Sequence, residues 1–135
     1  YCIFNPENKL RDFFYLLMSK TINLGNKGED LAAEMLAEKG YVIISANWRD
    51  KHKEIDIIAM DDDTLVFVEV KTRSENFWGN PEEFVSRKKQ KLLINAAEAY
   101  IAETGFTGNS RFDVVSVLYL KSGMEIEHII EAFYP

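Results

Sequence analysis

The chain has 135 residues, of which 47% are hydrophobic and 28% are charged, which suits one soluble domain with a single core. Its only cysteine, Cys2, excludes an intramolecular disulfide and a cysteine-rich zinc site. No apolar run approaches the roughly 20 residues of a membrane span, so we expect a cytoplasmic protein without a membrane partner. The net charge of −6 argues mildly against a nucleic-acid partner, although the segment from Lys71 to Lys91 carries six basic and three acidic residues.

The first half of the chain predicts a helix followed by three strands. We expect residues 1–20 to be an N-terminal extension and residues 21–135 to form one domain. Apolar residues at helical spacing predict a helix over residues 28–39, ended by Gly40. Strands are predicted at residues 41–49, 54–60 and 64–71, with a hairpin loop at residues 61–64. The last of these strands is almost continuously apolar, which predicts burial on both faces.

The second half predicts a loop, a helix and two strands. The loop covers residues 74–81, and Pro81 is expected to open a helix that runs to about Glu103. The buried side of this helix is predicted to consist of Leu92, Leu93, Ala96, Ala97, Tyr100 and Ile101. Strands follow at residues 111–120 and 124–133. The element order α-β-β-β-α-β-β predicts an α/β fold with a mixed β-sheet flanked by helices.

Three charged residues interrupt the apolar strands. Glu69 and Lys71 point to the same side of their strand because side chains alternate between faces. Counted outward from the hairpin loop, Asp56 and Glu69 are near cross-strand neighbours, which places them roughly 5 Å apart. An unpaired buried charge is expensive, so these residues need partners.

Two adjacent carboxylates need a proton, a cation or a salt bridge between them. A hard divalent cation, magnesium or manganese, prefers such oxygen ligands, and Lys71 could then orient a water or stabilise charge on a phosphate. The alternative is a salt bridge at a sheet edge. Glu29, in the first turn of the first helix, is either a third acid of this site or a surface residue that complements the helix dipole.

The order of these motifs resembles a known pattern. Glu29, Asp56 and Glu69-Val70-Lys71 resemble the PD-(D/E)XK nucleases of the restriction-endonuclease-like superfamily. The stretches GNKGEDLAAEMLAEKGYVIISANWR, EIDIIAMDDDTLVFVEVKTR and RFDVVSV are similar to the YraN family of uncharacterised bacterial proteins. The likeness spans roughly residues 24–118.

The resemblance implies a restriction-endonuclease-like core, similar to that of Holliday-junction resolvases. It implies Asp56 and Glu69 as metal ligands, Lys71 as the catalytic lysine and Glu29 as an auxiliary acid. Family motif positions also hold Asn47 and Asp113, which we interpret as structural. One departure is Lys53, where the family commonly has glycine, so the turn before Glu54 is expected to differ in backbone shape.

Basic residues are the candidates for nucleic-acid contact. Arg49 and Arg73 fall on family motif positions, where a phosphate contact and a surface salt bridge are both open, and Lys88 and Lys91 belong to the basic segment. The first hypothesis is a metal-dependent endonuclease that hydrolyses phosphodiester bonds in DNA, including branched DNA, with a homodimer as one arrangement. The alternative is a catalytically silent module that binds nucleic acid or a protein. The sequence does not separate DNA from RNA.

Overall fold

The computed structural model describes residues 27–74 and 85–135, and the predicted extension at residues 1–20 and most of the predicted loop at residues 74–81 lie outside these ranges. The elements are α2 (Lys27–Glu38), β1 (Val42–Asp50), β2 (Lys53–Asp61), β3 (Thr64–Ser74), α3 (Arg87–Thr104), β4 (Ser110–Leu120) and β5 (Gly123–Phe133). Their order confirms the predicted α-β-β-β-α-β-β sequence. No helix in the described part of the chain combines the length and apolar character needed to cross a membrane.

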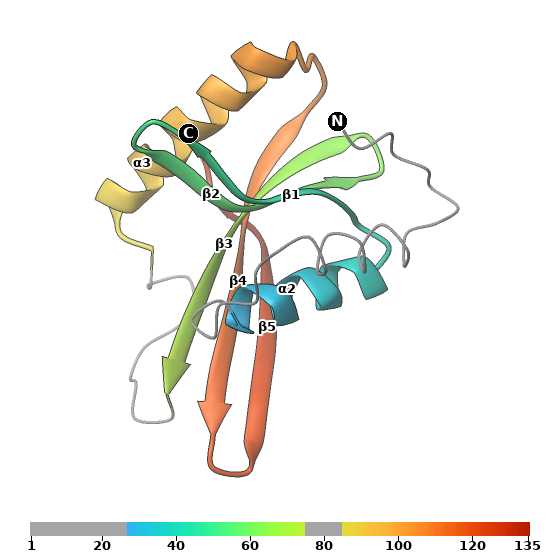
Figure 1. The fold of residues 1–135 in the computed structure, drawn as a ribbon, viewed down its shortest axis with the longest axis vertical. Coiled ribbons are helices and arrows are strands. Elements are labelled where there is room, and N and C mark those ends of the chain that lie inside the picture. Colours follow the sequence, from blue (N-terminus) through green and yellow to red (C-terminus); the bar gives the residue numbers. More distant parts are fainter. Residues whose placement is uncertain (1–26, 75–84) are drawn as a thin grey trace.

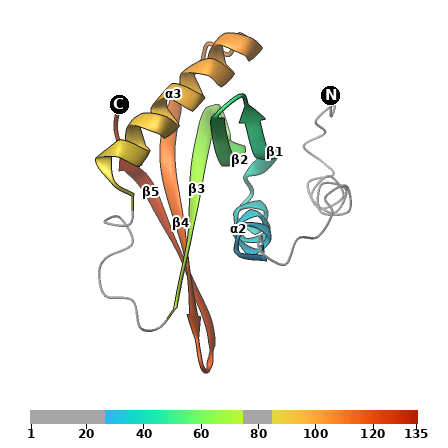
Figure 2. The same ribbon diagram turned by 60° about the vertical axis from the view of Figure 1, so that its left-hand side comes forward.

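The five strands form one mixed sheet, and their order in the sheet, β1-β2-β3-β4-β5, is also their order along the chain. Only β3 and β4 are parallel, and every other neighbouring pair is antiparallel. The helices lie on opposite sides of the sheet, α2 on one face and α3 on the other (Figures 1 and 2). The α/β class is therefore as predicted and is consistent with a restriction-endonuclease-like core.

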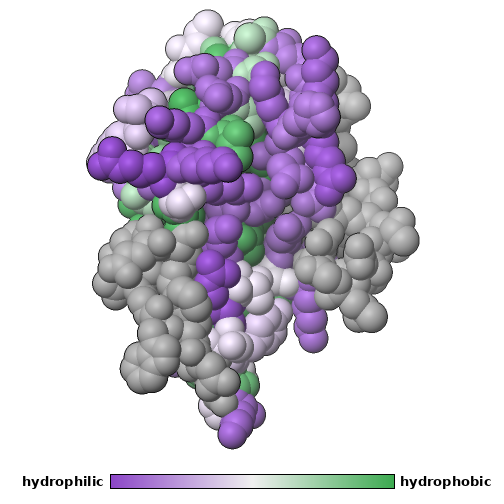
Figure 3. Space-filling model, turned by 90° about the vertical axis from the view of Figure 1, so that its left-hand side faces the viewer, coloured by the Kyte–Doolittle hydropathy of each residue, from purple (hydrophilic) through white to green (hydrophobic). Residues whose placement is uncertain are grey.

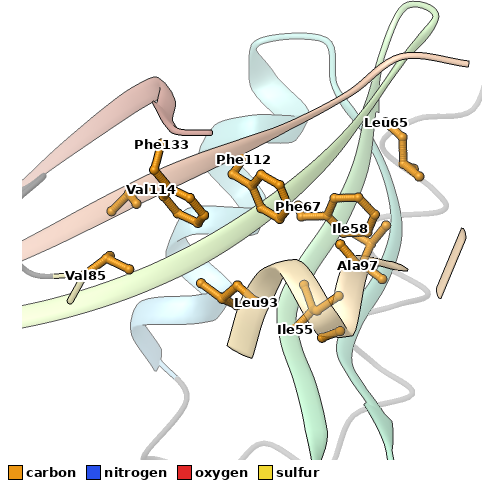
Figure 4. Close-up of a cluster of buried hydrophobic side chains, with 11 residues drawn as sticks. Ile55, Ile58, Leu65, Phe67, Val85, Leu93, Ala97, Phe112, Val114 and Phe133 are labelled. Carbon is orange, nitrogen blue, oxygen red and sulfur yellow. The ribbon is translucent and has the colours of Figure 1, made fainter. Parts of the chain in front are cut away.

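Each face of the sheet has its own hydrophobic core. Under α2, Leu36 packs with Val66 and Val68 of β3. Under α3, the rings of Phe67, Phe112 and Phe133 stack in a row, with centroid separations of 5.6 and 4.9 Å (Figure 4). Because successive residues of β3 enter different cores, the predicted burial of this strand on both faces is confirmed.

Helix α3 begins later than predicted. It starts at Arg87 rather than at Pro81, because Ser86 is extended (ψ 159°) and its hydroxyl accepts a hydrogen bond from the Lys89 N–H at 3.2 Å. Leu92 was expected on the buried side but is 55% exposed. It lies about 100° around the helix from Leu93, which is buried with Ala96 and Ala97.

Strands β2 and β3 separate at Glu69. Their ladder runs from the pair Asp61 and Thr64 to the pair Ile57 and Val68. Beyond this point β3 continues to Ser74 as a partner of β4 (Figure 1). Just beyond the ladder, the N–H group of Val70 donates a hydrogen bond to the side chain of Asp56 at 2.8 Å. A carboxyl group therefore replaces the backbone partner where the strands separate.

The turn between β1 and β2 accommodates Lys53 without strain. Lys53 lies inside β2, paired with Asp50, and the left-handed residue of the turn is Lys51, with φ 57°. A lysine in place of glycine at position 53 therefore does not require a positive φ.

Candidate active site

Two carboxylates meet where β2 and β3 separate. The carboxyl group of Asp56 lies close enough to that of Glu69 to raise its pKa, and Oδ2 of Asp56 accepts the N–H of Val70. Glu69 is only 5% exposed. The structure thus brings together the two acids that the hairpin count placed side by side.

This environment changes the protonation of the pair. Burial of Glu69 and the nearby charge of Asp56 raise the pKa of Glu69 to about 7, although Lys89 and Lys71 oppose the shift. Near neutral pH Glu69 consequently holds a proton for much of the time. A divalent cation would take the place of that proton and satisfy both carboxylates.

Two lysines approach the same oxygen of Glu69. The Nζ atom of Lys71 lies 3.4 Å from Oε1, and the Nζ atom of Lys89, which reaches in from α3, lies 3.7 Å from it. Their side chains are 23% and 29% exposed, whereas Glu69 itself is buried. Asp56, Glu69 and Lys71 therefore converge as expected, with the two lysines between the buried carboxyl group and the surface.

Sequence reasoning missed Lys89 as a member of this site. The signal was present, because Lys89 precedes the buried Leu93 by four residues and therefore lies on the inner side of α3. Without the position of β3 relative to α3, however, this lysine resembled its exposed neighbours Lys88 and Lys91.

The donor set of the pair fits magnesium or manganese. Both prefer oxygen ligands, and magnesium is commonly held by one or two carboxylates together with water and substrate phosphate. Among residues 27–74 and 85–135 no group of three or more His, Cys, Asp or Glu side chains is arranged to hold a metal ion. Asp56 and Glu69 are therefore the two neighbouring oxygen donors of this site, and Glu29 is not arranged with them as a third.

Glu29 lies close to this region through its helix. It is half-buried in the first turn of α2. The preceding residue, Gly28, packs so tightly on β3 that an added Cβ would lie 2.5 Å from Oγ1 of Thr72. The absence of a side chain at position 28 thus lets the start of α2 approach the strand next to Lys71.

The residues predicted to contact nucleic acid are two arginines that bind groups of the protein and two exposed lysines on α3. Arg49 is exposed and forms a long ion pair of 3.8 Å with Glu54, while Arg73 donates to the carbonyl of Thr72 at 3.0 Å. Lys88 and Lys91 are exposed on α3, the helix that also carries Lys89. The face of the molecule seen in Figure 3 is mainly hydrophilic, with apolar groups visible only in small separate areas.

A second charged cluster, which we call the Asp113 network, lies on the α2 side of the sheet. Asp113 is fully buried and accepts hydrogen bonds from Arg111 at 3.0 and 3.2 Å, from His128 at 2.7 Å and from the N–H of Glu131 at 3.1 Å. Arg111 also binds Asp61 and the hydroxyl of Tyr41. This network ties β4 to β2 and β5, which agrees with the structural role expected for Asp113.

Comparison with known proteins gives a consistent result. The model of a family described as "Uncharacterised protein family UPF0102" matches residues 28–117. A UPF0102 protein of Flavobacterium psychrophilum is 42% identical over 117 residues, covering 87% of this chain and 98% of the relative. One of Flavobacterium johnsoniae is 46% identical over 121 residues, with 87% and 98% covered, and one of Prosthecochloris aestuarii is 47% identical over 119 residues, with 83% and 94% covered.

The matched region contains nearly all of α2, the whole of β1 to β3 and of α3, and most of β4. It therefore includes both the paired carboxyl groups and the two lysines. The resemblance to the YraN family is thereby confirmed, and the chain belongs to the uncharacterised protein family UPF0102.

Proposed function

We propose that this protein is a cytoplasmic, metal-dependent endonuclease that hydrolyses phosphodiester bonds of nucleic acid, with DNA, including branched DNA, as the expected substrate. One observation carries the proposal. The carboxyl groups of Asp56 and Glu69 lie together at the point where two strands separate, and the ammonium group of Lys71 lies 3.4 Å from the carboxyl group of Glu69. A site that combines hard oxygen ligands with a cationic donor suits the hydrolysis of a phosphodiester.

The residues divide the work as follows. Asp56 and Glu69 would hold magnesium or manganese, which when bound supplies a Lewis acid for the phosphate and an activated water. Lys71 would donate a hydrogen bond to that water or to a non-bridging phosphate oxygen, where negative charge develops in the transition state. Glu29, on the helix that packs against β3 through Gly28, is the proposed auxiliary acid.

The basic residues outside the pair would position the nucleic-acid backbone. Lys88 and Lys91 are exposed on the helix that borders the site, and Arg73 follows Lys71 on β3. Contacts of this kind fix register and orientation but carry no sequence information. We therefore expect recognition of the shape of the nucleic acid rather than of its sequence.

The alternative is a silent binding module on the same fold. It is favoured by the 5% exposure of Glu69 and by the two lysines that neutralise it, since an ion-paired acid can serve structure alone. The net charge of −6 also weakens phosphate binding in general.

Cleavage assays separate the two functions. Purified protein is incubated with labelled duplex, single-stranded and four-way-junction DNA and with RNA, in magnesium, manganese or EDTA. We expect metal-dependent cleavage by the wild type and by Glu98→Gln, which changes an exposed carboxylate on α3, and at least a hundredfold loss for Glu69→Gln. Equal activity of Glu69→Gln and the wild type would establish the binding module.

A homodimer is part of the proposal for junction substrates, because cutting two strands symmetrically requires two sites related by a two-fold axis. Light scattering with and without a four-way junction measures this directly. A strictly monomeric protein on the junction would restrict the activity to one strand per encounter.

A further inference from the structure

Lys89 occupies a position where the helix pattern calls for an apolar residue. The inner side of α3 is formed by Leu93, Ala96 and Ala97, all buried against the sheet. Lys89 lies one turn before Leu93 on this same side. An aliphatic side chain there would extend the core toward the end of the helix, whereas the ammonium group of Lys89 instead reaches Glu69 at 3.7 Å.

The surrounding charges make this placement unfavourable for the helix itself. The first turn of α3 consists of Arg87, Lys88, Lys89 and Gln90. Cations at the N-terminus of a helix oppose its dipole, which favours negative charge at that end. Local sequence choices that disfavour the element they belong to are expected at functional sites. An anion bound beside the first turn of α3 would offset the repulsion between its basic side chains and the helix dipole.

The charge balance of the proposed active site identifies the anion. With both carboxyl groups ionised, Asp56 and Glu69 are balanced by Lys71 and Lys89 only while no metal is bound. With a divalent cation on the two carboxylates, the formal charge of these four side chains and the ion is positive. A phosphodiester group is the anion that the proposed reaction brings to this position.

We propose that Lys89 is a second substrate-contacting lysine, whose ammonium group leaves Glu69 and binds a non-bridging oxygen of the scissile phosphate. The inference rests on the proposed function and deepens it. Lys71 comes from a strand and Lys89 from the helix on the α3 side of the sheet, so the phosphate would be held between two elements. Lys89 would thereby add to the transition-state stabilisation expected of Lys71.

Three variants test this role. Lys89→Met keeps the length of the side chain and continues the apolar side of α3, so folding should persist, as circular dichroism and urea unfolding would verify. Lys89→Arg retains the positive charge. Lys121→Met removes an exposed lysine in the turn between β4 and β5 and serves as the matched control.

The first measurement is the single-turnover cleavage rate of a fluorescein-labelled four-way junction in magnesium, with protein in saturating excess so that affinity does not enter. We expect Lys89→Met to lose about 100-fold in rate, Lys89→Arg to recover at least tenfold of that loss, and Lys121→Met to match the wild type. A Lys89→Met rate within threefold of the control would overturn the inference while leaving the proposed function intact.

The second measurement keeps the inference testable if the wild type cleaves nothing, which would mean failure of the proposed function. Fluorescence anisotropy then gives the affinity for the same junction over a range of salt concentrations. Loss of a phosphate contact should reduce the slope of log affinity against log salt by about one for Lys89→Met and not for Lys121→Met. An unchanged slope, or no binding at low salt, would overturn the role of Lys89.

Discussion

The two buried acids in the described part of the chain, Asp113 and Glu69, differ in their partners and consequently in their protonation. Burial alone would raise the pKa of Asp113, but hydrogen bonds from His128, Arg111 and the backbone of Glu131 outweigh it and hold that pKa below its ordinary value. Burial and the neighbouring Asp56 instead raise the pKa of Glu69 to about 7. Two acids that are both buried thus have pKa values shifted in opposite directions.

The comparison teaches how a structural acid can be distinguished from a reactive one. Asp113 is surrounded by donors at hydrogen-bond distance, so its charge is fully compensated inside the protein. Glu69 faces a second acid, and its lysines stand 3.4 and 3.7 Å away. An acid in the second situation is incomplete without a proton or a metal ion.

Removing the charge of Asp113 should have the largest effect on stability. Asp113→Asn removes a fully buried charge that compensates the half-buried Arg111, which should lower the free energy of unfolding by about 3–5 kcal/mol. Urea unfolding at pH 7 measures this change. The control is Asp63→Asn in the exposed hairpin turn, expected within about 0.5 kcal/mol of the wild type. Similar losses in both variants would contradict the structural role of Asp113.

Glu69 should make the protein less stable as the pH rises. Its folded pKa lies above the unfolded value of 4.5, so the native state retains a proton that the unfolded state releases. Between about pH 5 and pH 7 this group should reduce stability by up to about 3 kcal/mol as the pH rises. Glu69→Gln should flatten that interval in urea unfolding curves. Parallel curves for the two proteins would show that Glu69 titrates normally.

The affinity for a metal ion should depend on whether Glu69 is protonated. Because a cation competes with the proton that Glu69 holds, manganese binding measured by calorimetry should weaken up to about tenfold per pH unit below pH 7. Asp56→Asn should abolish binding, and Asp62→Asn, which changes an exposed turn residue, should leave it unchanged. Affinity that does not vary between pH 5.5 and pH 8 would count against this pair as the metal site.

The exposed contact between Lys39 and His128, at the edge of the Asp113 network, should contribute least to stability. The Nζ atom of Lys39 lies 3.0 Å from Nδ1 of His128, but this contact is exposed to solvent. Lys39→Met should therefore change the free energy of unfolding by less than about 1 kcal/mol. A loss of 2 kcal/mol or more in urea unfolding would mean that Lys39 belongs to the buried part of the network.

Much of the fold follows from local patterns that the sequence displays. Apolar periodicity predicted the order of the helices and strands, and the short hairpin loop at residues 61–64 set the register that brings Asp56 opposite Glu69. Lys71 then follows from the alternation of side chains along β3. These predictions succeeded because each depends on residues that are close together in the chain.

The parts that escaped prediction depend on long-range packing. The contact of Lys89 with Glu69 requires knowing how α3 lies on the sheet, and the late start of α3 depends on the hydrogen bond of Ser86. The Asp113 network joins Tyr41, Asp61, Arg111 and His128 from separate parts of the chain. The raised pKa of Glu69 depends on burial, which strand periodicity indicates only in part.

The sequential order of the strands has a consequence for how the chain folds. The β1-β2-β3 meander and the β4-β5 hairpin each contain only local pairings, and the parallel ladder between β3 and β4 is the one strand pairing that spans α3. Because closing long loops is slow relative to forming hairpins, we expect this ladder to limit the folding rate. Asp56 and Glu69 would then meet within the early meander, whereas Arg111 of the Asp113 network would gain its partners Asp61 and Tyr41 only after the two halves have docked.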